Sequence, residues 1–588
     1  MPITLRRNAQ GKVVFHTEST EGSPAMQMVR GGLGAEAHIE PADLMGTLRF
    51  QGDTVVAVRA NLPAGKAAAK QFGVRLPALP PSGYRIQKAK HRAGRALLVV
   101  GGDLFGMLAG LADVLRRSSL SAEGLTYRGG ERTEKPAFPL RYYWTWDHST
   151  NWMLDDPGTQ VMGACNAYLK RPETFVSDYQ RLIDHCVESR FNGVVIWGFL
   201  RDSHGGEVFA DRIARYARDR GVAIMPGVGT TGYGGVYYEG LHPANLETYL
   251  ALHPERGNQG ADGRKSKSEL SAYNPENQEW IKRSLEWLYG RFAIGGVNLE
   301  NMDLLVDHSA AARRARAKIM SGEKDYFKDQ FFAYRTALEV AQRMAPTAWN
   351  TYATYTGFGL GQNVANAGAD MGVEPYFAKR LPPSSIAQWT LTGMLRPEPA
   401  PLRDWLTSGA PASVYDNPNW PRGLRPPTPR SAGLLHHGSQ CTINARRNAL
   451  CVSTFAEACL RGHDAGLEGL GIYGEVTSRT LPALLNYLAA RHWTYHPGSS
   501  LEEFAAAELA PRVGGEKAAG EFIETLILLE EGKPEAAYKI ANPRRREFHP
   551  YPRGNAPDPQ AGRNWWTLCE WTAQRHQPSK VFGFDDVI

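Results

Sequence analysis

Short apolar segments with strand character open this chain and lead into a segment of helical periodicity. Residues 46–50, 53–58 and 95–102 predict strands, and the last runs directly into 104–115, whose apolar positions recur at helical spacing. We expect a small α/β domain over residues 1–135. The turn at Gly101, Gly102 and Asp103 lacks the full dinucleotide fingerprint, so we interpret it as a strand-to-helix turn and not as a phosphate site.

Beyond a proline-punctuated linker, strands alternate with helices, which is typical of βα units and a parallel sheet. The pattern predicts strands at 140–146, 193–199, 222–228, 295–299, 348–352 and 470–474, two more at 386–392 and 412–415, and helices that include 176–189, 208–220 and 277–292. Eight such units predict a (β/α)8 catalytic barrel over residues 136–490.

The C-terminal region, residues 491–588, begins with helical periodicity and ends in an irregular tail rich in proline and arginine. Ser500 and Glu503 form a capping-box pattern at the start of a predicted helix. The predicted fold class is therefore α/β: a TIM (β/α)8 barrel preceded by a small α/β domain and followed by a helical C-terminal region.

Composition adds 14 Trp and 24 Tyr, many of them in predicted loops. Such rings can stack on the apolar faces of sugars, although a large protein also buries many aromatics. The net charge of +7 is spread thinly, and the basic run at 544–546 has no interleaved aromatics, so we expect no nucleic-acid partner.

No segment approaches the ~20 apolar residues that cross a bilayer, and the N-terminus has no apolar leader. We expect no membrane partner and a cytoplasmic location, or a periplasmic or secreted one if a leader was removed. The six cysteines show no CxxC pairing and read as reduced thiols. The oligomeric state, a homo-oligomer included, stays open.

Functional side chains of a barrel project from the C-terminal ends of its strands. Three glutamates lie at such ends, Glu300, Glu374 and Glu475, and we take them as the candidate catalytic residues. Hydrolysis of a glycosidic bond needs one carboxylic acid to protonate the leaving oxygen and a second carboxylate as nucleophile or base. The two are about 5–5.5 Å apart in retaining enzymes and about 6.5–9.5 Å apart in inverting ones. We expect Glu300 to be the acid.

Aromatic, amide and charged side chains near the same strand ends are the candidate substrate-binding residues. They are Trp146, Asp147, His148, Trp197, Arg201, Asn298, Asn301, Tyr376, Trp389 and Tyr473. The pair His436 and His437 has no third ligand at a recognisable spacing, so we expect neither a metal nor another cofactor.

Several segments resemble bacterial α-glucuronidases and β-hexosaminidases that carry an α/β domain before a barrel. They are residues 83–86, 97–111, 273–280, 455–459, 466–469 and 473–475. Hexosaminidases that use the substrate acetamido group have an Asp-Glu pair after the fourth strand, whereas this chain has Leu299 before Glu300. A lone glutamate is closer to the α-glucuronidase pattern and implies Glu300 as the acid. A uronic-acid substrate would need a cation, for which Arg201, Lys379 and Arg380 are candidates.

These observations favour an exo-acting glycoside hydrolase on an oligosaccharide or polysaccharide-derived substrate, with a uronic acid as the leading substrate. The alternatives are a β-N-acetylhexosaminidase-like exo-glycosidase, a catalytically inactive sugar-binding barrel, and a polysaccharide lyase. Barrels host many chemistries, so the fold does not separate these functions.

Overall fold

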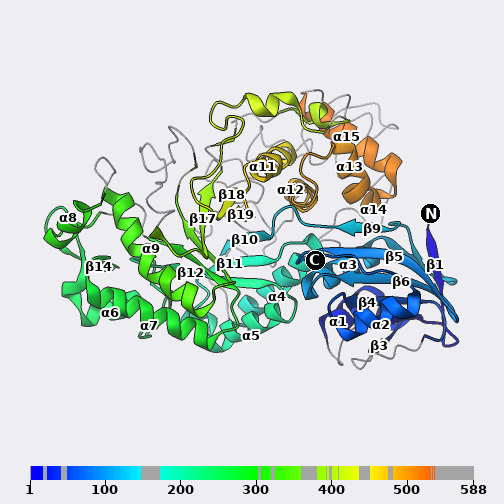
Figure 1. Ribbon diagram of the computed structural model, residues 1–588, viewed down its shortest axis with the longest axis horizontal. Coiled ribbons are helices and arrows are strands. Elements are labelled where there is room, and N and C mark those ends of the chain that lie inside the picture. Colours follow the sequence, from blue (N-terminus) through cyan, green and yellow to red (C-terminus); the bar gives the residue numbers. More distant parts are fainter. Residues whose placement is uncertain are drawn as a thin grey trace, which may run out of the picture.

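The computed structural model describes residues 2–17, 23–41, 50–147, 172–301, 306–319, 325–355, 357–358, 380–391, 394–395, 400–407, 409–435, 451–473, 481–531, 533 and 536. Figure 1 shows an N-terminal α/β domain in blue beside a closed barrel, with the C-terminal helices in orange lying above the N-terminal domain. This arrangement confirms the predicted fold class.

The N-terminal domain contains two sheets. The larger has the strand order β3-β2-β4-β6-β5-β9, and the smaller has the order β1-β8-β7. The strands are β1 (Ile3–Arg6), β2 (Val13–Thr17), β3 (Ala37–Pro41), β4 (Thr54–Arg59), β5 (Tyr84–His91), β6 (Gly94–Gly101), β7 (Ser118–Leu120), β8 (Gly124–Tyr127) and β9 (Arg132–Glu134). The helices are α1 (Pro24–Leu33), α2 (Pro63–Phe72) and α3 (Leu104–Arg116).

The turn between β6 and α3 is the strand-to-helix turn that the sequence predicts. Asp103 is the N-cap of α3, and its carboxylate accepts a hydrogen bond of 2.7 Å from the Gly106 amide. A side-chain cap of this kind satisfies one of the amide groups that a helix leaves unpaired at its start. The aspartate therefore has a structural role at this turn.

Eight parallel strands close the barrel in the order β10-β11-β12-β15-β16-β17-β18-β19. They are β10 (Leu140–Trp146), β11 (Gly193–Trp197), β12 (Ala223–Gly229), β15 (Gly296–Glu300), β16 (Trp349–Ala353), β17 (Ser385–Thr390), β18 (Ser431–Leu435) and β19 (Gly469–Tyr473). Seven of the eight predicted strands overlap these segments.

The eighth predicted strand, at 412–415, is wrong. Residues Ala412–Asp416 form a 3-10 helix after Pro411, and the seventh barrel strand is Ser431–Leu435. Gly433 weakens the strand signal there, yet the glycine is needed because a Cβ at this position would lie 2.4 Å from Leu391.

Helices surround the barrel: α4 (Pro172–Ser189), α5 (Gly206–Arg218), α6 (Leu246–Leu252), α7 (Pro275–Arg291), α8 (Ala310–Arg316), α9 (Asp325–Met344), α11 (Val452–Asp464) and α12 (Leu481–Trp493). The hairpin of β13 (Gly257–Gln259) and β14 (Lys265–Leu270) is inserted between α6 and α7. None of the described helices is long and apolar enough to cross a membrane.

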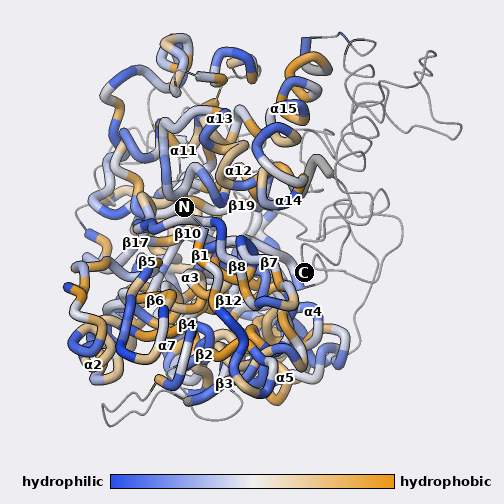
Figure 2. Tube along the Cα trace, turned by 90° about the vertical axis from the view of Figure 1, so that its right-hand side faces the viewer, coloured by the Kyte–Doolittle hydropathy of each residue, from blue (hydrophilic) through white to orange (hydrophobic). Residues whose placement is uncertain are grey.

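The barrel strands are buried on both faces, which is why their sequences are nearly continuous apolar runs. In β10, Tyr142 and Trp144 belong to the cluster inside the barrel, whereas Tyr143 packs in the larger core between the strands and the surrounding helices. Figure 2 shows hydrophobic segments concentrated on central strands and on α3, with hydrophilic segments more frequent towards the outside. Alternate residues of each strand therefore face the interior.

The C-terminal region begins with α13 (Leu501–Phe504), continues through a π-helical turn (Ala505–Leu509) and α14 (Ala510–Val513), and leads into α15 (Glu516–Glu530). The predicted capping box is confirmed. The Glu503 amide donates to the Ser500 hydroxyl at 3.1 Å, and the Ser500 amide donates to the Glu503 carboxylate at 2.8 Å.

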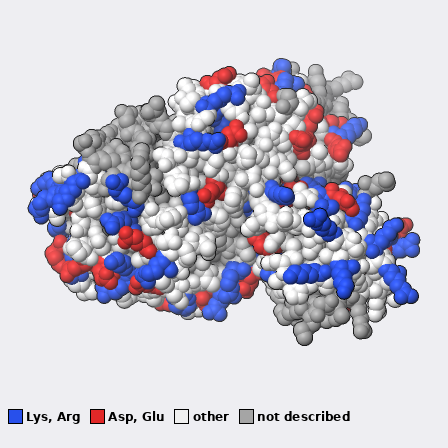
Figure 3. All heavy atoms as spheres, in the orientation of Figure 1, with Lys and Arg blue, Asp and Glu red and all other residues white. Residues whose placement is uncertain are grey.

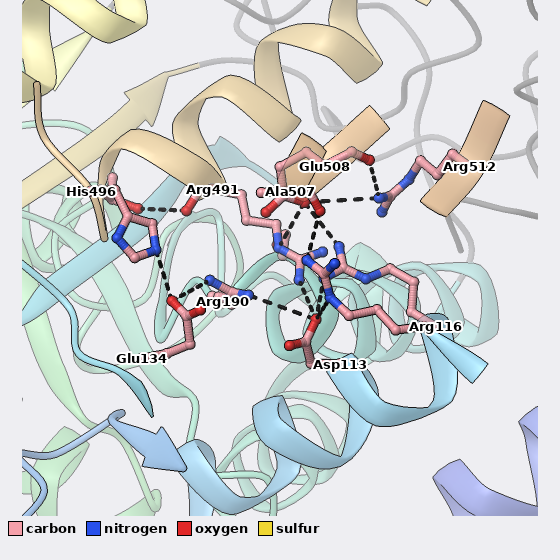
Figure 4. Close-up of polar contacts among 12 residues, drawn as sticks. Asp113, Arg116, Glu134, Arg190, Arg491, His496, Ala507, Glu508 and Arg512 are labelled. Carbon is pink, nitrogen blue, oxygen red and sulfur yellow. Dashed lines mark hydrogen bonds and ion pairs between the residues drawn. The ribbon is translucent and has the colours of Figure 1, made fainter. Parts of the chain in front are cut away.

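A buried network of charges joins the N-terminal domain, the barrel and the C-terminal helices (Figure 4). Arg190, just after α4, lies 3.3 Å from Glu134 of β9 and 3.8 Å from Asp113 of α3. Arg491 of α12 lies 3.5 Å from Glu508 in the π-helical turn. We call these five residues the junction network. Because its members come from all three regions, it ties the regions together at one buried point.

The exposed surface carries both signs of charge. Figure 3 shows acidic and basic side chains mixed over most of the visible face, with basic ones gathered at the end that holds α8. That helix contains Arg313 and Arg314. The expectation of no nucleic-acid partner stays a prediction.

Candidate active site at the barrel mouth

The strand ends with the predicted site residues form the mouth of the barrel. Glu300 ends β15 and lies two residues beyond Asn298, so both side chains are on the interior side of the strand. Asn298 is buried, whereas Glu300 is partly exposed. The glutamate therefore sits where the closed interior opens.

Asn298 is the centre of the barrel floor. Its Oδ1 accepts hydrogen bonds from the indole N–H groups of Trp144 and Trp197, both at 3.1 Å. Its amide nitrogen donates to Thr351 Oγ1 at 2.9 Å and to Gln388 Oε1 at 3.1 Å. Four partners use the full hydrogen-bonding capacity of an asparagine side chain. We therefore correct the expectation that Asn298 binds substrate: it supports the floor beneath the site.

Trp197 is a second residue of the floor. It is completely buried, and a Cβ at Gly227 would lie 2.3 Å from its ring, so glycine is required for the close approach of β12. Its indole N–H is already bonded to Asn298. The expected contact between Trp197 and substrate is not supported by this placement.

Trp389 points away from the barrel interior. It is completely buried in the outer core, contacts Phe358 with ring centroids 5.6 Å apart, and donates its indole N–H to Ser431 at 3.1 Å. The neighbouring Gln388 is the residue that faces inward. The expectation for Trp389 is therefore wrong, because an odd step along a strand moves a side chain to the other face.

Glu300 is held by Tyr355, a residue that the sequence reasoning missed. The Tyr355 hydroxyl lies 3.1 Å from Glu300 Oε2 and 2.8 Å from the Asn301 carbonyl oxygen, and donates its hydrogen towards both. Tyr355 has a φ of 58°, in the left-handed region that non-glycine residues rarely adopt. Such strain persists where the surroundings hold the residue, and it is frequent at active sites. The strand-end rule could have identified Tyr355, which lies two residues after β16.

Two further tyrosines stay protonated near Glu300. Burial, with the charge of Glu300 added, raises the pKa of Tyr142 and Tyr334 above the ordinary value. The Tyr142 hydroxyl donates to Gln388 at 2.9 Å, and the Tyr334 hydroxyl donates to the Ala353 carbonyl at 3.0 Å. The Thr230 amide also donates to the Glu300 carbonyl at 2.7 Å. The backbone that presents Glu300 is thus well anchored.

Asn301 lies beside the mouth. It is buried, its backbone N–H donates to the Tyr334 hydroxyl at 3.2 Å, and it lines a small pocket with Asn258, Glu269 and Asp307. The pocket has a volume of about 20 Å³, enough for roughly one water molecule. The expected role of Asn301 in substrate binding stays a prediction.

Asp147, at the end of β10, is completely buried and forms an ion pair of 2.7 Å with Arg201. Arg201 also pairs with Glu239 and lies over the ring of Tyr238, 4.7 Å from its centroid. The His204 ring lies 3.3 Å from Asp147. We call Asp147, Arg201, His204 and Glu239 the mouth cluster.

Aromatic rings line the remaining part of the mouth. Trp146 is partly exposed, and its ring centroid lies 6.1 Å from that of Tyr238. Tyr473, at the end of β19, packs 4.5 Å from Trp144. Tyr233 has a φ of 49° and contacts Trp197 at 5.6 Å. The structure thus brings Trp146 and Tyr473 together with Tyr233 and Tyr238, which the sequence reasoning did not select.

Four of the predicted site residues, Glu374, Glu475, His148 and Tyr376, lie outside the described residues, as do His436 and His437. Within the described residues, no group of three or more His, Cys, Asp or Glu side chains could hold a metal ion.

A scan against protein-family models and a search of curated proteins give no match. Among solved structures, the chain is similar to a β-N-acetylhexosaminidase from Bacteroides fragilis, with 13% identity, a TM-score of 0.44, and coverage of 84% of this chain and 89% of that one. It is also similar to a GH20 exo-β-N-acetylglucosaminidase from Vibrio harveyi, with 10% identity, a TM-score of 0.48, and coverage of 90% and 75%.

A third similar structure is a GH138 enzyme targeting pectin rhamnogalacturonan II. The identity is 11% and the TM-score 0.50, over 90% of this chain and 56% of that one. At this identity the likeness to the third structure shows a shared fold alone. The chain therefore shares the fold of this third structure over 90% of its length.

Proposed function

We propose that the protein is a glycoside hydrolase in which Glu300 is the general acid. The observation that carries the proposal is the position of Glu300: a partly exposed carboxyl at the mouth of a closed barrel, hydrogen-bonded by Tyr355. Catalytic groups of barrel enzymes lie at this end of the strands. The similar structures are named as glycosidases, which supports the same class of reaction.

In this mechanism the Glu300 carboxylic acid donates its proton to the glycosidic oxygen as the bond to the anomeric carbon breaks. The sugar carbon then accepts either a carboxylate, in a retaining enzyme, or an activated water molecule, in an inverting one. Glu374 and Glu475 remain the candidates for that second carboxylate. Tyr355 would orient Glu300, and Trp146 and Tyr238 would stack on the sugar ring.

The residue before Glu300 differs from the one that the β-N-acetylhexosaminidase alternative requires. Leu299, which precedes Glu300, is completely buried in the outer core. An aspartate that orients a substrate acetamido group is therefore absent from that position. We accordingly favour direct participation of a second protein carboxylate.

The test is release of sugar from a panel of aryl glycosides and uronic-acid-capped oligosaccharides by the wild type and by Glu300→Gln. We expect the variant to lose about two or more orders of magnitude in kcat/KM, because it cannot donate the proton. Glu276→Gln, an exposed side chain on α7, is the matched control and should retain wild-type turnover.

Three other outcomes would contradict the proposal. Unchanged turnover in Glu300→Gln would remove the acid from this position. Sugar binding without turnover on any substrate would identify an inactive sugar-binding barrel. A product that absorbs in the ultraviolet would identify a lyase, since elimination leaves an unsaturated uronate.

A further inference from the structure

The charge balance of the mouth cluster bears on the substrate. Arg201 is 7% exposed, and both sides of its guanidinium group are occupied by carboxylates. Its Nε lies 2.7 Å from Asp147 Oδ2, and its Nη1 contacts Glu239 Oε2. The ring of Tyr238 covers one face of the guanidinium plane. The positive charge of Arg201 is therefore already matched from within the protein.

The four side chains of the mouth cluster carry no surplus positive charge. One guanidinium faces two carboxylates, which leaves one negative charge when His204 is neutral and none when it is protonated. His204 is buried and stacks on Phe175, with centroids 4.4 Å apart. A substrate carboxylate brought here would lose its hydration and meet carboxylates that already hold the cation, which is unfavourable.

The sequence also predicts Lys379 and Arg380 as receptors for a uronate. Lys379 lies outside the described residues. Arg380 lines a pocket with Arg335 and Glu339 of α9, in the layer of helices around the barrel. In the described part of the chain, Arg201 is thus the candidate that reaches the mouth.

We infer that the barrel mouth takes a neutral sugar in preference to a uronic acid. This inference rests on the proposed function and names its substrate class, and it replaces the uronic acid that the sequence favours. The rings of Trp146, Tyr233 and Tyr238 are partly exposed at the mouth, and they offer apolar faces to the C–H groups of a sugar. The buried ion pair would then position Glu239 to accept a hydrogen bond from a sugar hydroxyl.

The experiment compares pairs of 4-nitrophenyl glycosides that differ only at C6: the α and β glucosides against glucuronides, and galactosides against galacturonides. We expect the neutral member of the pair that is turned over to have a kcat/KM about tenfold or more above its uronide, since one unmatched charge costs at least that much in a partly buried site. A wild type that prefers the uronide would overturn the inference while leaving the proposed function intact.

Binding separates the two proposals when no glycoside is turned over. Quenching of tryptophan fluorescence in Glu300→Gln would be measured with methyl glucoside, methyl galactoside and the matching uronates. Tighter binding of a neutral sugar would support the inference although the hydrolase proposal had failed. Tighter binding of a uronate, or no binding of either, would overturn it.

A single variant tests the charge balance directly. The Glu239 side chain is 57% exposed, so Glu239→Gln should fold normally and leave Arg201 with one carboxylate partner. We expect the uronide-to-neutral ratio of kcat/KM to rise about threefold to tenfold. Glu36→Gln, which breaks a similar surface pair with Arg7 in the N-terminal domain, is the control and should leave the ratio unchanged. An unchanged ratio in Glu239→Gln would contradict the electrostatic argument.

Discussion

At the domain junction the carboxylates of Asp113, Glu134 and Glu508 are at most 3% exposed and face six arginines, which are Arg116, Arg117, Arg132, Arg190, Arg491 and Arg512. At the mouth, Glu300 is partly exposed and Glu239 is 57% exposed. Burial alone would raise the pKa of the junction carboxyls, but the surrounding guanidinium groups lower it in all three. The three junction carboxyls are therefore ionised at neutral pH.

At the mouth, by contrast, carboxylates outnumber arginines. One arginine there faces two carboxylates, and Glu300 contacts the neutral hydroxyl of Tyr355. A site that must donate a proton cannot surround its acid with cations, because they would hold the carboxyl ionised. The ratio of arginines to carboxylates, more than the presence of either, therefore distinguishes the structural cluster at the junction from the proposed reactive site at the mouth.

The largest expected effect is loss of stability in acid, since it involves all three junction carboxylates. Their pKa values are lowered on folding, so the unfolded chain binds more protons and stability falls as the pH drops below about 5 towards the folded pKa values. Burial also lowers the pKa of His492 to about 3. Because an unfolded histidine binds its proton near pH 6.5, the loss should begin there.

Urea unfolding followed by fluorescence over a pH series would measure this loss. In His492→Gln the slope between about pH 6.5 and pH 5 should flatten, while the steeper loss at lower pH persists. A free energy of unfolding that stays constant down to about pH 4 would contradict the lowered pKa values of the junction carboxyls.

Next in size is the effect of Glu508→Gln. It leaves Arg491 and Arg116 without a carboxylate that lies 3.5 and 2.9 Å away, so we expect a loss of about 3–5 kcal/mol in the free energy of unfolding. Glu36→Gln removes an exposed partner of Arg7 and should cost under about 1 kcal/mol. Equal losses in the two variants would mean that the buried ion pairs of Glu508 contribute no more to stability than the exposed pair of Glu36.

The smallest effect is expected for Tyr355→Phe at the mouth. Loss of one hydrogen bond to the Glu300 carboxylate should lower kcat about tenfold, or about 1.4 kcal/mol. Because that bond favours the ionised carboxylate, its removal should also move the alkaline limb of the pH–rate profile to higher pH. Tyr216→Phe is the control, since Tyr216 donates to Asp184 at 2.8 Å on the helix layer. A lower kcat with an unchanged profile would indicate a structural role only.

The sequence alone predicts the barrel. Alternating strands and helices identified seven of the eight strands, and the capping box at Ser500 marked the start of α13. It also placed Glu300 at a strand end, because the rule for barrel mouths needs only the order of elements. These features are local or periodic, so they can be recognised in the amino-acid sequence.

The tertiary fold determines which strand-end side chains are accessible. Trp197, Asn298 and Trp389 lie at predicted strand ends, yet the first two form the floor and the third faces the helices. It also decided that Arg201 is neutralised by Asp147 and Glu239, which are 54 and 38 residues away in sequence. The junction network likewise joins Asp113 to Arg491. The charge balance of a site depends on which side chains, distant in sequence, are in contact in the fold. No local sequence pattern predicts these contacts.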